Sequence, residues 1–158
     1  MAAKRREDPA LLVALRALFG AHVFVALIDL RLHALGTVPV GWRVIGLAAF
    51  ALSMSAVLWS IVVNRHFVPQ MLVETGGHRL VTGGPYGLVR HPGYAGMAIG
   101  APASALALGS WAALVPAVLF SVLVVIRATR EDDFLRRNLA GYVEYSDRVR
   151  YRVAPFVW

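Results

Sequence analysis

The sequence has 158 residues, of which 58% are hydrophobic and 16% are charged, whereas soluble domains are about 45–50% apolar and about 25% charged. This composition excludes a disordered chain, and it excludes a soluble domain, which could not bury so much apolar surface at this size. Because the sequence has no cysteine, it also excludes disulfides, a thiolate nucleophile and cysteine-ligated metal sites.

The charges are placed around apolar segments. The 16 Lys and Arg residues against 9 Asp and Glu give a net charge of +7, which in a soluble protein would suggest nucleic-acid binding. Here Lys4, Arg5 and Arg6 precede the first apolar segment, and a second group follows the last one, namely Arg127, Arg130, Arg136, Arg137, Arg148, Arg150 and Arg152. Such clusters are retained on the cytoplasmic side. We therefore predict an integral membrane protein, of a bacterial inner membrane, with both termini cytoplasmic and no nucleic-acid partner.

The first predicted membrane-spanning helix covers residues 10–35. Pro9 suits the first turn of a helix and Gly36 its end. His22 and Asp29, seven residues apart, share one face of this helix. An ionisable residue inside a span is a functional candidate by default, but a His–Asp pair that locks helices together is equally consistent, so we assign these residues no role.

The second predicted span, residues 42–63, places Gly46, Ser53 and Ser60 at heptad spacing. Small residues in such a row let helices approach closely in lipid, so this row predicts a helix-packing face. A catalytic serine is the weaker interpretation, since no base lies at a useful spacing.

Residues 64–92 interrupt the apolar pattern with glycine, histidine, arginine and tyrosine, which predicts a loop with at most short helical or extended pieces. Spans 93–108 and 111–127 follow. Gly109 and Ser110 alone join them, which predicts an antiparallel hairpin, and Gly96, Gly100 and Ser104 predict a close-packing ridge.

The sequence RATREDDFLRRNL continues the fourth helix into a tail, residues 128–158, and places Glu131 and Asp132 beside an apolar stripe. Because the hairpin tip is uncharged, we expect it outside, so that the loop and the tail meet on the cytoplasmic face. The predicted fold is an all-α, polytopic membrane helical bundle of one domain with about four transmembrane helices.

The densest group of polar residues lies in the sequence HRLVTGGPYGLVRHPGYAG, residues 78–96. It offers hydrogen-bond donors and cations on a glycine-rich backbone that can approach a ligand closely, and it ends where a membrane helix begins. These properties are typical of a cradle for a polar ligand. A cytoplasmic loop that merely touches lipid phosphates is the alternative.

This sequence, followed by RATRED, by Gly141-Tyr142 and Tyr145, and by Ala154-Pro155, resembles the isoprenylcysteine carboxyl methyltransferase family, within the integral-membrane methyltransferases that include phospholipid methyltransferases. The resemblance implies an enzyme that transfers a methyl group from S-adenosylmethionine to a lipophilic acceptor. It implies a cofactor pocket lined, largely through backbone groups, by His78, Arg79, Leu80, Val81, Tyr86, His91, Pro92, Gly93 and Tyr94.

The resemblance also implies roles for charged residues. Glu131 would pair with the ammonium group of the cofactor, with Asp132 as the alternative carboxylate. Arg127 would face the methyl acceptor, and Arg90 is the second catalytic candidate. The chemistry fits, because a sulfonium methyl donor is already activated and the enzyme has mainly to align the acceptor and exclude water. No metal is needed, and His91 or Tyr94 could act as a base for acceptors that lose a proton.

Two other classes of function compete with this interpretation. A haem-binding bundle could take axial ligands from the histidines, His22, His33, His66, His78 and His91, but only His22 lies well inside a predicted span. A non-enzymatic membrane adaptor or transporter subunit would place polar residues in mid-membrane, whereas here they gather at one face. The acceptor stays open among an isoprenylcysteine-like carboxylate, a phospholipid amine, a quinone-like hydroxyl and another lipophilic small molecule, with Arg127 favouring an anion. The oligomeric state also stays open.

Overall fold

The computed structural model describes residues 4–5, 8–32, 37–64, 72–73 and 80–154. These residues form the α-helices α1 Pro9–Leu32, α2 Val40–Val63, α3 Pro92–Ala107, α4 Leu114–Asn138 and α5 Tyr142–Arg148. A short 3-10 helix, η1, spans Gly84–Gly87, and two short strands, β1 Lys4–Arg5 and β2 Leu72–Val73, pair antiparallel. The all-helical class is confirmed, and β2 and η1 are the short pieces expected between residues 64 and 92.

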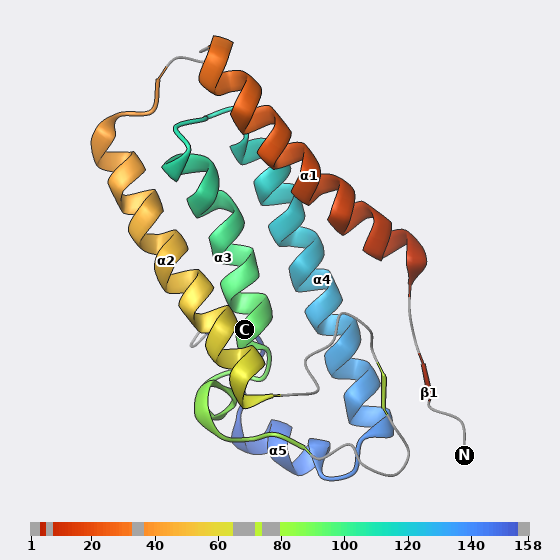
Figure 1. The fold of residues 1–158 in the computed structure, drawn as a ribbon. Coiled ribbons are helices and arrows are strands. Elements are labelled where there is room, and N and C mark those ends of the chain that lie inside the picture. Colours follow the sequence, from red (N-terminus) through yellow and green to blue (C-terminus); the bar gives the residue numbers. More distant parts are fainter. Residues whose placement is uncertain (1–3, 6–7, 33–36, 65–71, 74–79, 155–158) are drawn as a thin grey trace.

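The long helices pack in an order that differs from their order in the sequence. α2 lies along α3, α3 packs on α4, and α4 packs on α1, so that α2 and α1 are the outer helices (Figure 1). The α3–α4 connection lies at one end of the bundle with the end of α1 and the start of α2, and α5 lies across the opposite end (Figure 1). We call these the hairpin end and the α5 end.

Glycines explain why α2 and α3 approach so closely. A Cβ atom at Gly96 would lie 2.6 Å from Val57 Cγ2 and 2.7 Å from the Ser53 carbonyl oxygen. A Cβ atom at Gly46 would lie 2.7 Å from the backbone nitrogen of Ala107. Real Cβ atoms essentially never lie so close to other atoms, so α2 and α3 can approach this closely at these two points only because glycine stands there. The predicted packing face of α2 is confirmed, because Gly46, Ser53 and Ser60 are all buried.

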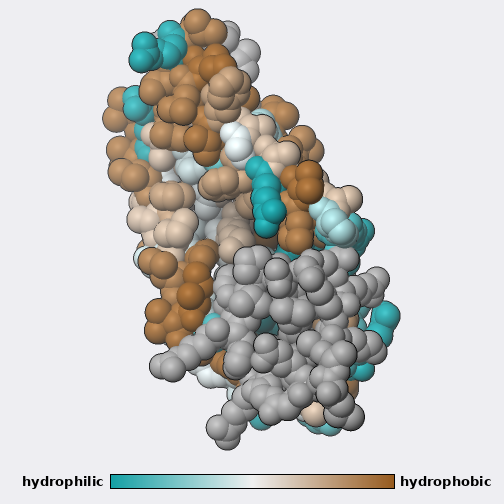
Figure 2. Space-filling view, turned by 45° about the vertical axis from the view of Figure 1, so that its right-hand side comes forward, coloured by the Kyte–Doolittle hydropathy of each residue, from teal (hydrophilic) through white to brown (hydrophobic). Residues whose placement is uncertain are grey.

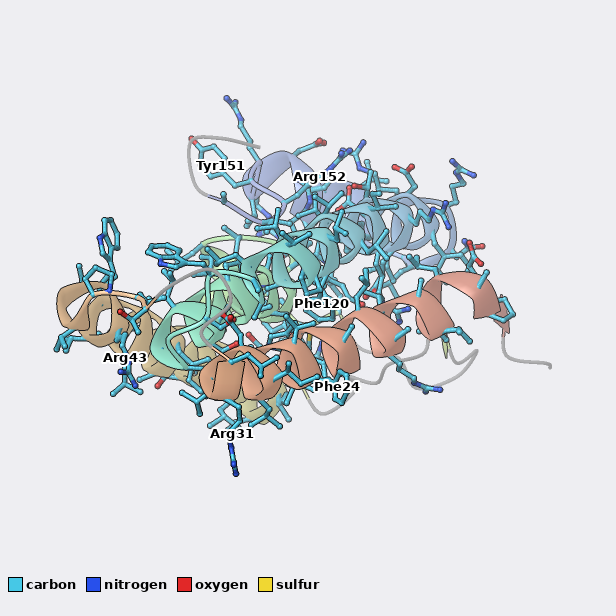
Figure 3. All side chains as sticks on the ribbon, turned by 90° about the horizontal axis from the view of Figure 1, so that it is seen from above. Phe24, Arg31, Arg43, Phe120, Tyr151 and Arg152 are labelled. Atoms are coloured by element: carbon cyan, nitrogen blue, oxygen red, sulfur yellow. The ribbon has the colours of Figure 1, made fainter. Side chains whose placement is uncertain are left out.

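The connection between α3 and α4 covers residues 108–113, so it contains Gly109 and Ser110 but is longer than the two residues predicted. Gly109 has a φ of +81°, in the left-handed region that glycine adopts without steric cost. The Ser110 hydroxyl accepts a hydrogen bond from the backbone nitrogen of Ala113 at 3.0 Å and so ties the turn to the start of α4. Beside the turn, Arg43 packs against Gly109, whereas Arg31 extends away from the bundle (Figure 3).

His22 and Asp29 attach α1 to this hairpin. The two ring nitrogens of His22 contact the Ser104 hydroxyl of α3 at 3.0 Å and the Phe19 carbonyl oxygen at 2.8 Å. Asp29 accepts a hydrogen bond from the Ser110 hydroxyl at 2.6 Å. Both residues are buried. Of the two interpretations left open by the sequence, these contacts fit the one in which polar residues lock helices together.

α1 and α2 have 24 residues each and are long and apolar enough to cross a membrane. Many apolar side chains on their outer faces are exposed, and apolar side chains cover most of the described surface above the grey atoms in Figure 2. α3 has 16 residues, or about 24 Å at about 1.5 Å per residue, which is shorter than the ~30 Å hydrocarbon core. Helices are thus present at all the predicted spans, while α3 and the apolar part of α4 are shorter than a full crossing requires.

Candidate active site

Polar side chains from distant parts of the chain meet at the α5 end. They come from η1, the start of α3, the last turns of α4, α5, and the segment after α5. Tyr151 and Arg152 lie beside α5, on the other side of the bundle from Arg31 (Figure 3). The predicted meeting of the loop before α3 with the tail is therefore seen in the residues that the structure describes.

A row of hydrogen-bonded side chains joins α3 to α4. The Tyr94 hydroxyl donates to Glu131 Oε2 at 2.6 Å and accepts from Arg127 Nε at 2.9 Å. The Arg127 guanidinium also lies over the Tyr94 ring, with Cζ 5.9 Å from the ring centroid, which is a cation–π distance. Tyr94 and Arg127 are buried, whereas Glu131 is half-buried. The carboxylate of this row is thus its most accessible member.

The neighbouring carboxylate has a different environment. Asp132 is fully buried. It accepts hydrogen bonds from Arg90 Nε at 2.8 Å and Nη2 at 3.1 Å, and from the Tyr142 hydroxyl at 2.7 Å. His91 Nε2 lies 3.3 Å and Arg152 Nε 3.2 Å from its two oxygens. Asp132 is therefore the centre of a cluster that joins α4 to α3, α5 and the segment after α5.

The electrostatics of this cluster keep Asp132 ionised. Burial alone would raise the pKa of its carboxyl, but hydrogen bonds from His91, Tyr142 and Arg90 bring the pKa below its ordinary value. Burial, together with the Asp132 charge, raises the pKa of the Tyr142 hydroxyl. Tyr142 therefore stays protonated and acts as a donor to an anion, which is the arrangement that stabilises a buried carboxylate.

Arg90 ties the segment after α5 to the start of α3. Its Nη1 atom donates to the carbonyl oxygens of Ser146 at 3.3 Å, Val149 at 2.8 Å and Arg150 at 3.0 Å. Its backbone nitrogen donates to the Tyr151 carbonyl at 2.9 Å, and that of His91 to the Arg152 carbonyl at 2.8 Å. All three nitrogens of the Arg90 guanidinium thus donate hydrogen bonds to other groups of the protein.

The η1 turn is held from two sides. The Tyr86 hydroxyl lies 3.4 Å from the Ser60 carbonyl and 3.3 Å from Asn64 Nδ2, both at the end of α2. The Tyr86 carbonyl accepts from the Tyr145 hydroxyl of α5 at 2.7 Å. Gly84, with a φ of +59°, allows the turn to lie against Val63. Burial raises the pKa of Tyr86, so its hydroxyl stays a neutral hydrogen-bonding group.

Comparison with known proteins identifies the family. The family model described as phospholipid methyltransferase matches residues 42–141, which is more than half of the chain. The chain belongs to the phospholipid methyltransferase family. This confirms the predicted resemblance to the group of integral-membrane methyltransferases that includes phospholipid methyltransferases. The matched residues contain Tyr94, Arg127 and Glu131 and end just before α5.

A curated relative of this phospholipid methyltransferase family member is the delta(14)-sterol reductase of Mus musculus. The two sequences are 37% identical over 86 residues, which are 52% of this chain and 20% of the reductase. The match thus covers a fifth of the length of that relative.

The structure brings most of the predicted site residues of this family member together. The two connected groups described above contain Tyr94, Arg127, Glu131, Asp132, Arg90 and His91. Pro92 and Gly93 are buried in the first turn of α3, and Leu80 and Val81 are half-buried, with Leu80 next to Gly141 before α5. His78 and Arg79 lie outside the described residues, so their predicted contacts stay predictions.

Sequence reasoning missed the contribution of the segment after α4. Arg152 was interpreted only as part of a basic flank, and Tyr142 and Tyr145 were given no role. The structure places all three in contact with site residues. A signal was present, because Tyr142 and Tyr145 are three residues apart and so share a helix face, and aromatic residues with polar tips are typical of buried surfaces with hydrogen-bond partners.

The histidines and acidic residues do not gather as metal ligands in the described part of the chain, where no group of three or more His, Cys, Asp or Glu side chains could hold a metal ion. For the haem alternative, His22 contacts Ser104 and Phe19, and His91 contacts Asp132. His33, His66 and His78 lie outside the described residues.

Proposed function

We propose that the protein transfers a methyl group from S-adenosylmethionine to a lipophilic acceptor at the cytoplasmic face of a membrane. One observation carries the proposal. The segment that matches the methyltransferase family contains the hydrogen-bonded row of Arg127, Tyr94 and Glu131. This row lies where the apolar helices meet the polar α5 end. A polar cofactor would reach this end from the cytoplasm, and a lipophilic acceptor would reach it from the bilayer.

Glu131 is the carboxylate we assign to the ammonium group of the cofactor. It is half-buried and accepts a hydrogen bond from Tyr94, so it is oriented and still accessible. Asp132 is fully buried and its oxygens already contact Arg90, His91 and Tyr142. A carboxylate surrounded in this way has no room for a further cation, and the choice left open by the sequence therefore favours Glu131.

The remaining residues fit the rest of this cofactor. The half-buried Leu80 and Val81 and the buried η1 turn around Tyr86 offer an apolar wall with backbone donors and acceptors. The start of α3 at Pro92 and Gly93 adds a close backbone approach. His78 and Arg79 stay predicted members of the same pocket.

In methyl transfer the main task of the protein is to position the acceptor against the methyl group. When bound, S-adenosylmethionine supplies a methyl group that is already activated. Arg127, held over the Tyr94 ring, would orient an anionic acceptor by a forked hydrogen bond. A carboxylate acceptor loses no proton, whereas for a hydroxyl or amine acceptor His91 would take up the proton; the Tyr94 hydroxyl already carries its proton and donates a hydrogen bond to Glu131. The isoprenylcysteine-like carboxylate is the acceptor that this arrangement favours.

We propose the same orientation that the charges predict. Arginines are dense at the α5 end, and the side chains of Arg130, Arg136, Arg137, Arg148 and Arg150 are exposed there. This end would face the cytoplasm and the anionic headgroups of its leaflet.

Calorimetric titration of the full chain in detergent with S-adenosylmethionine and S-adenosylhomocysteine tests the proposal. We expect saturable binding that Glu131→Gln weakens by about 10- to 100-fold, which corresponds to a charge-assisted hydrogen bond. Asp133→Asn makes the same chemical change two residues along α4 and should bind like the wild type. Arg127→Ala should bind the cofactor and lose methyl transfer to lipophilic carboxylates. A folded wild-type sample that does not bind either compound would overturn the proposal.

The sterol reductase relative supports a second candidate, the reduction of a lipophilic acceptor. Its identity of 37% over 86 residues is the observation in favour. The same titration separates the two candidates: binding of a reduced nicotinamide cofactor in place of S-adenosylmethionine would favour reduction. A coloured purified protein with a haem absorption band would instead favour the haem-binding interpretation.

A further inference from the structure

We propose that the segment after α5, residues 149–153, positions the cofactor-binding residues of α3 and α4 through Asp132. We call this segment the C-terminal clamp. In this proposal Asp132, Tyr142 and Arg152 are positioning residues that touch neither the cofactor nor the acceptor. The inference rests on the proposed function, because the positioned residues are Tyr94 and Glu131.

The backbone of the C-terminal clamp is held along most of its length. Its carbonyl oxygens at Tyr151 and Arg152 accept from the backbone nitrogens of Arg90 and His91 at 2.9 and 2.8 Å. Those at Val149 and Arg150 accept from Arg90 Nη1 at 2.8 and 3.0 Å. The clamp therefore lies along the residues that lead into the first turn of α3.

The side chain of Val153 extends the same contact into the bundle. It is 9% exposed and packs in a cluster with Leu11, Leu15, Tyr94 and Val124. This cluster thus includes the tyrosine that contacts Glu131. The clamp lies along the residues before α3 and shares a buried cluster with the side chain that reaches across to α4.

Asp132 links the clamp to the position of Glu131. The two residues are adjacent on α4, and Arg90 and His91 lie a few residues before Tyr94. Contacts of Asp132 with Arg90 and His91 therefore fix the spacing between α3 and α4 at the point where Tyr94 meets Glu131. Arg152 of the clamp lies 3.2 Å from the other Asp132 oxygen, so the clamp also contacts the residue that holds α3 and α4 at this spacing. A fully buried carboxylate that loses a cationic partner cannot replace it by hydrogen bonds to water. The position of Asp132 therefore depends on the clamp.

The family match covers one side of this arrangement. The matched residues end at Gly141, so they include Arg90, His91 and Asp132, whereas Tyr142 and the clamp lie beyond them.

Coupling of this kind is reciprocal. If the clamp holds the cofactor-binding residues in place, bound cofactor must hold the clamp in place by the same factor. The side chains of Arg148 and Arg150 are exposed, but the backbone that follows each of them is hydrogen-bonded. Trypsin can cleave there only when the clamp detaches, so the cleavage rate measures its detachment.

The experiment uses the full chain in detergent, with trypsin cleavage after Arg148 and Arg150 followed by mass spectrometry. S-adenosylhomocysteine at about ten times its dissociation constant should slow this cleavage about tenfold. Arg152→Gln and Tyr142→Phe should each weaken S-adenosylhomocysteine binding about tenfold and speed cleavage. Arg137→Gln removes an exposed arginine of α4 and should change neither quantity. Thermal unfolding checks that each variant is folded.

The outcomes separate this inference from the function on which it rests. Wild-type binding with no protection from trypsin, or folded variants that bind like the wild type, would overturn the clamp and leave the proposed function standing. A melting temperature that falls in Arg152→Gln while the affinity stays constant would mean that Arg152 is merely structural, which also overturns the inference. A wild-type protein that does not bind S-adenosylhomocysteine would overturn both.

Discussion

The two ends of the bundle bury ionisable side chains in different ways. At the hairpin end, His22 and Asp29 are buried and each contacts a serine of the α3–α4 hairpin. At the α5 end, Asp132 is buried among arginines, a histidine and a tyrosine, while Glu131 beside it is half-buried. Burial of ionisable side chains is therefore common to both ends. What distinguishes the α5 end is an oriented carboxylate that remains accessible.

The largest expected difference between the two ends comes from Asp132→Ala. It would leave the Arg90 guanidinium buried beside Arg152 without its anion, and removing one partner of a buried ion pair costs about 3–5 kcal/mol. Thermal and denaturant unfolding in detergent would measure this loss. Asp29→Ala at the hairpin end should cost less, about 1–3 kcal/mol, because it breaks a hydrogen bond to a neutral serine. Equal losses would contradict the distinction between the ends.

Acid should weaken the α5 end through protonation of Asp132. The ordinary pKa of an aspartate is 3.8 and that of Asp132 is lower in the folded protein. The unfolded chain therefore takes up this proton at a higher pH than the folded chain does, so the stabilisation is complete above about pH 4 and is lost as the pH falls below it. Melting temperatures measured from pH 7 to pH 3 should fall less steeply in Asp132→Asn than in the wild type. Parallel curves would assign the acid sensitivity to other groups.

The apolar contact between the two ends is tested by Gly96→Ala. Its Cβ atom would lie 2.6 Å from Val57 Cγ2, and overpacking of this kind costs about 1–3 kcal/mol. Gly20→Ala in α1 is the matched control, because nothing lies within 4 Å of a Cβ there, and it should be neutral or slightly stabilising. Unfolding in detergent compares the two variants. A neutral Gly96→Ala would mean that α2 and α3 separate easily.

The smallest effect on stability is expected from the contact of His22 with Ser104, which attaches α1 to the hairpin. Ser104→Ala removes the hydroxyl that His22 Nε2 contacts at 3.0 Å, which should cost about 1 kcal/mol and leave cofactor affinity unchanged. Ser55→Ala removes an exposed hydroxyl that bonds only within its own helix and is the control for stability. Loss of cofactor binding in Ser104→Ala would show that the hairpin end acts on the site.

The sequence predicts the long helices well because each is a continuous apolar segment, and α4 continues to Asn138 as the pattern of RATREDDFLRRNL indicates. It predicts neither β1 nor α5, because elements of a few residues are held by contacts with distant parts of the chain. Arg90 and Asp132 are 42 residues apart, and nothing local distinguishes them from other loop arginines and helix acids. Tyr94 and Glu131 were named from the family resemblance, whereas their hydrogen bond required the fold.

Val153 belongs to the same buried apolar cluster as Leu11 and Leu15, so the end of the described chain and the beginning of α1 contribute to one core. During synthesis, α1 emerges early and its main partner, α4, emerges late. The backbone hydrogen bonds of Arg90 and His91 with residues 151 and 152 cannot form until the ribosome has added those residues. Under the proposed function, a nascent chain halted before that point would keep its apolar helices in the membrane and lack the cofactor site, so shortened products of translation would be inactive without being unfolded.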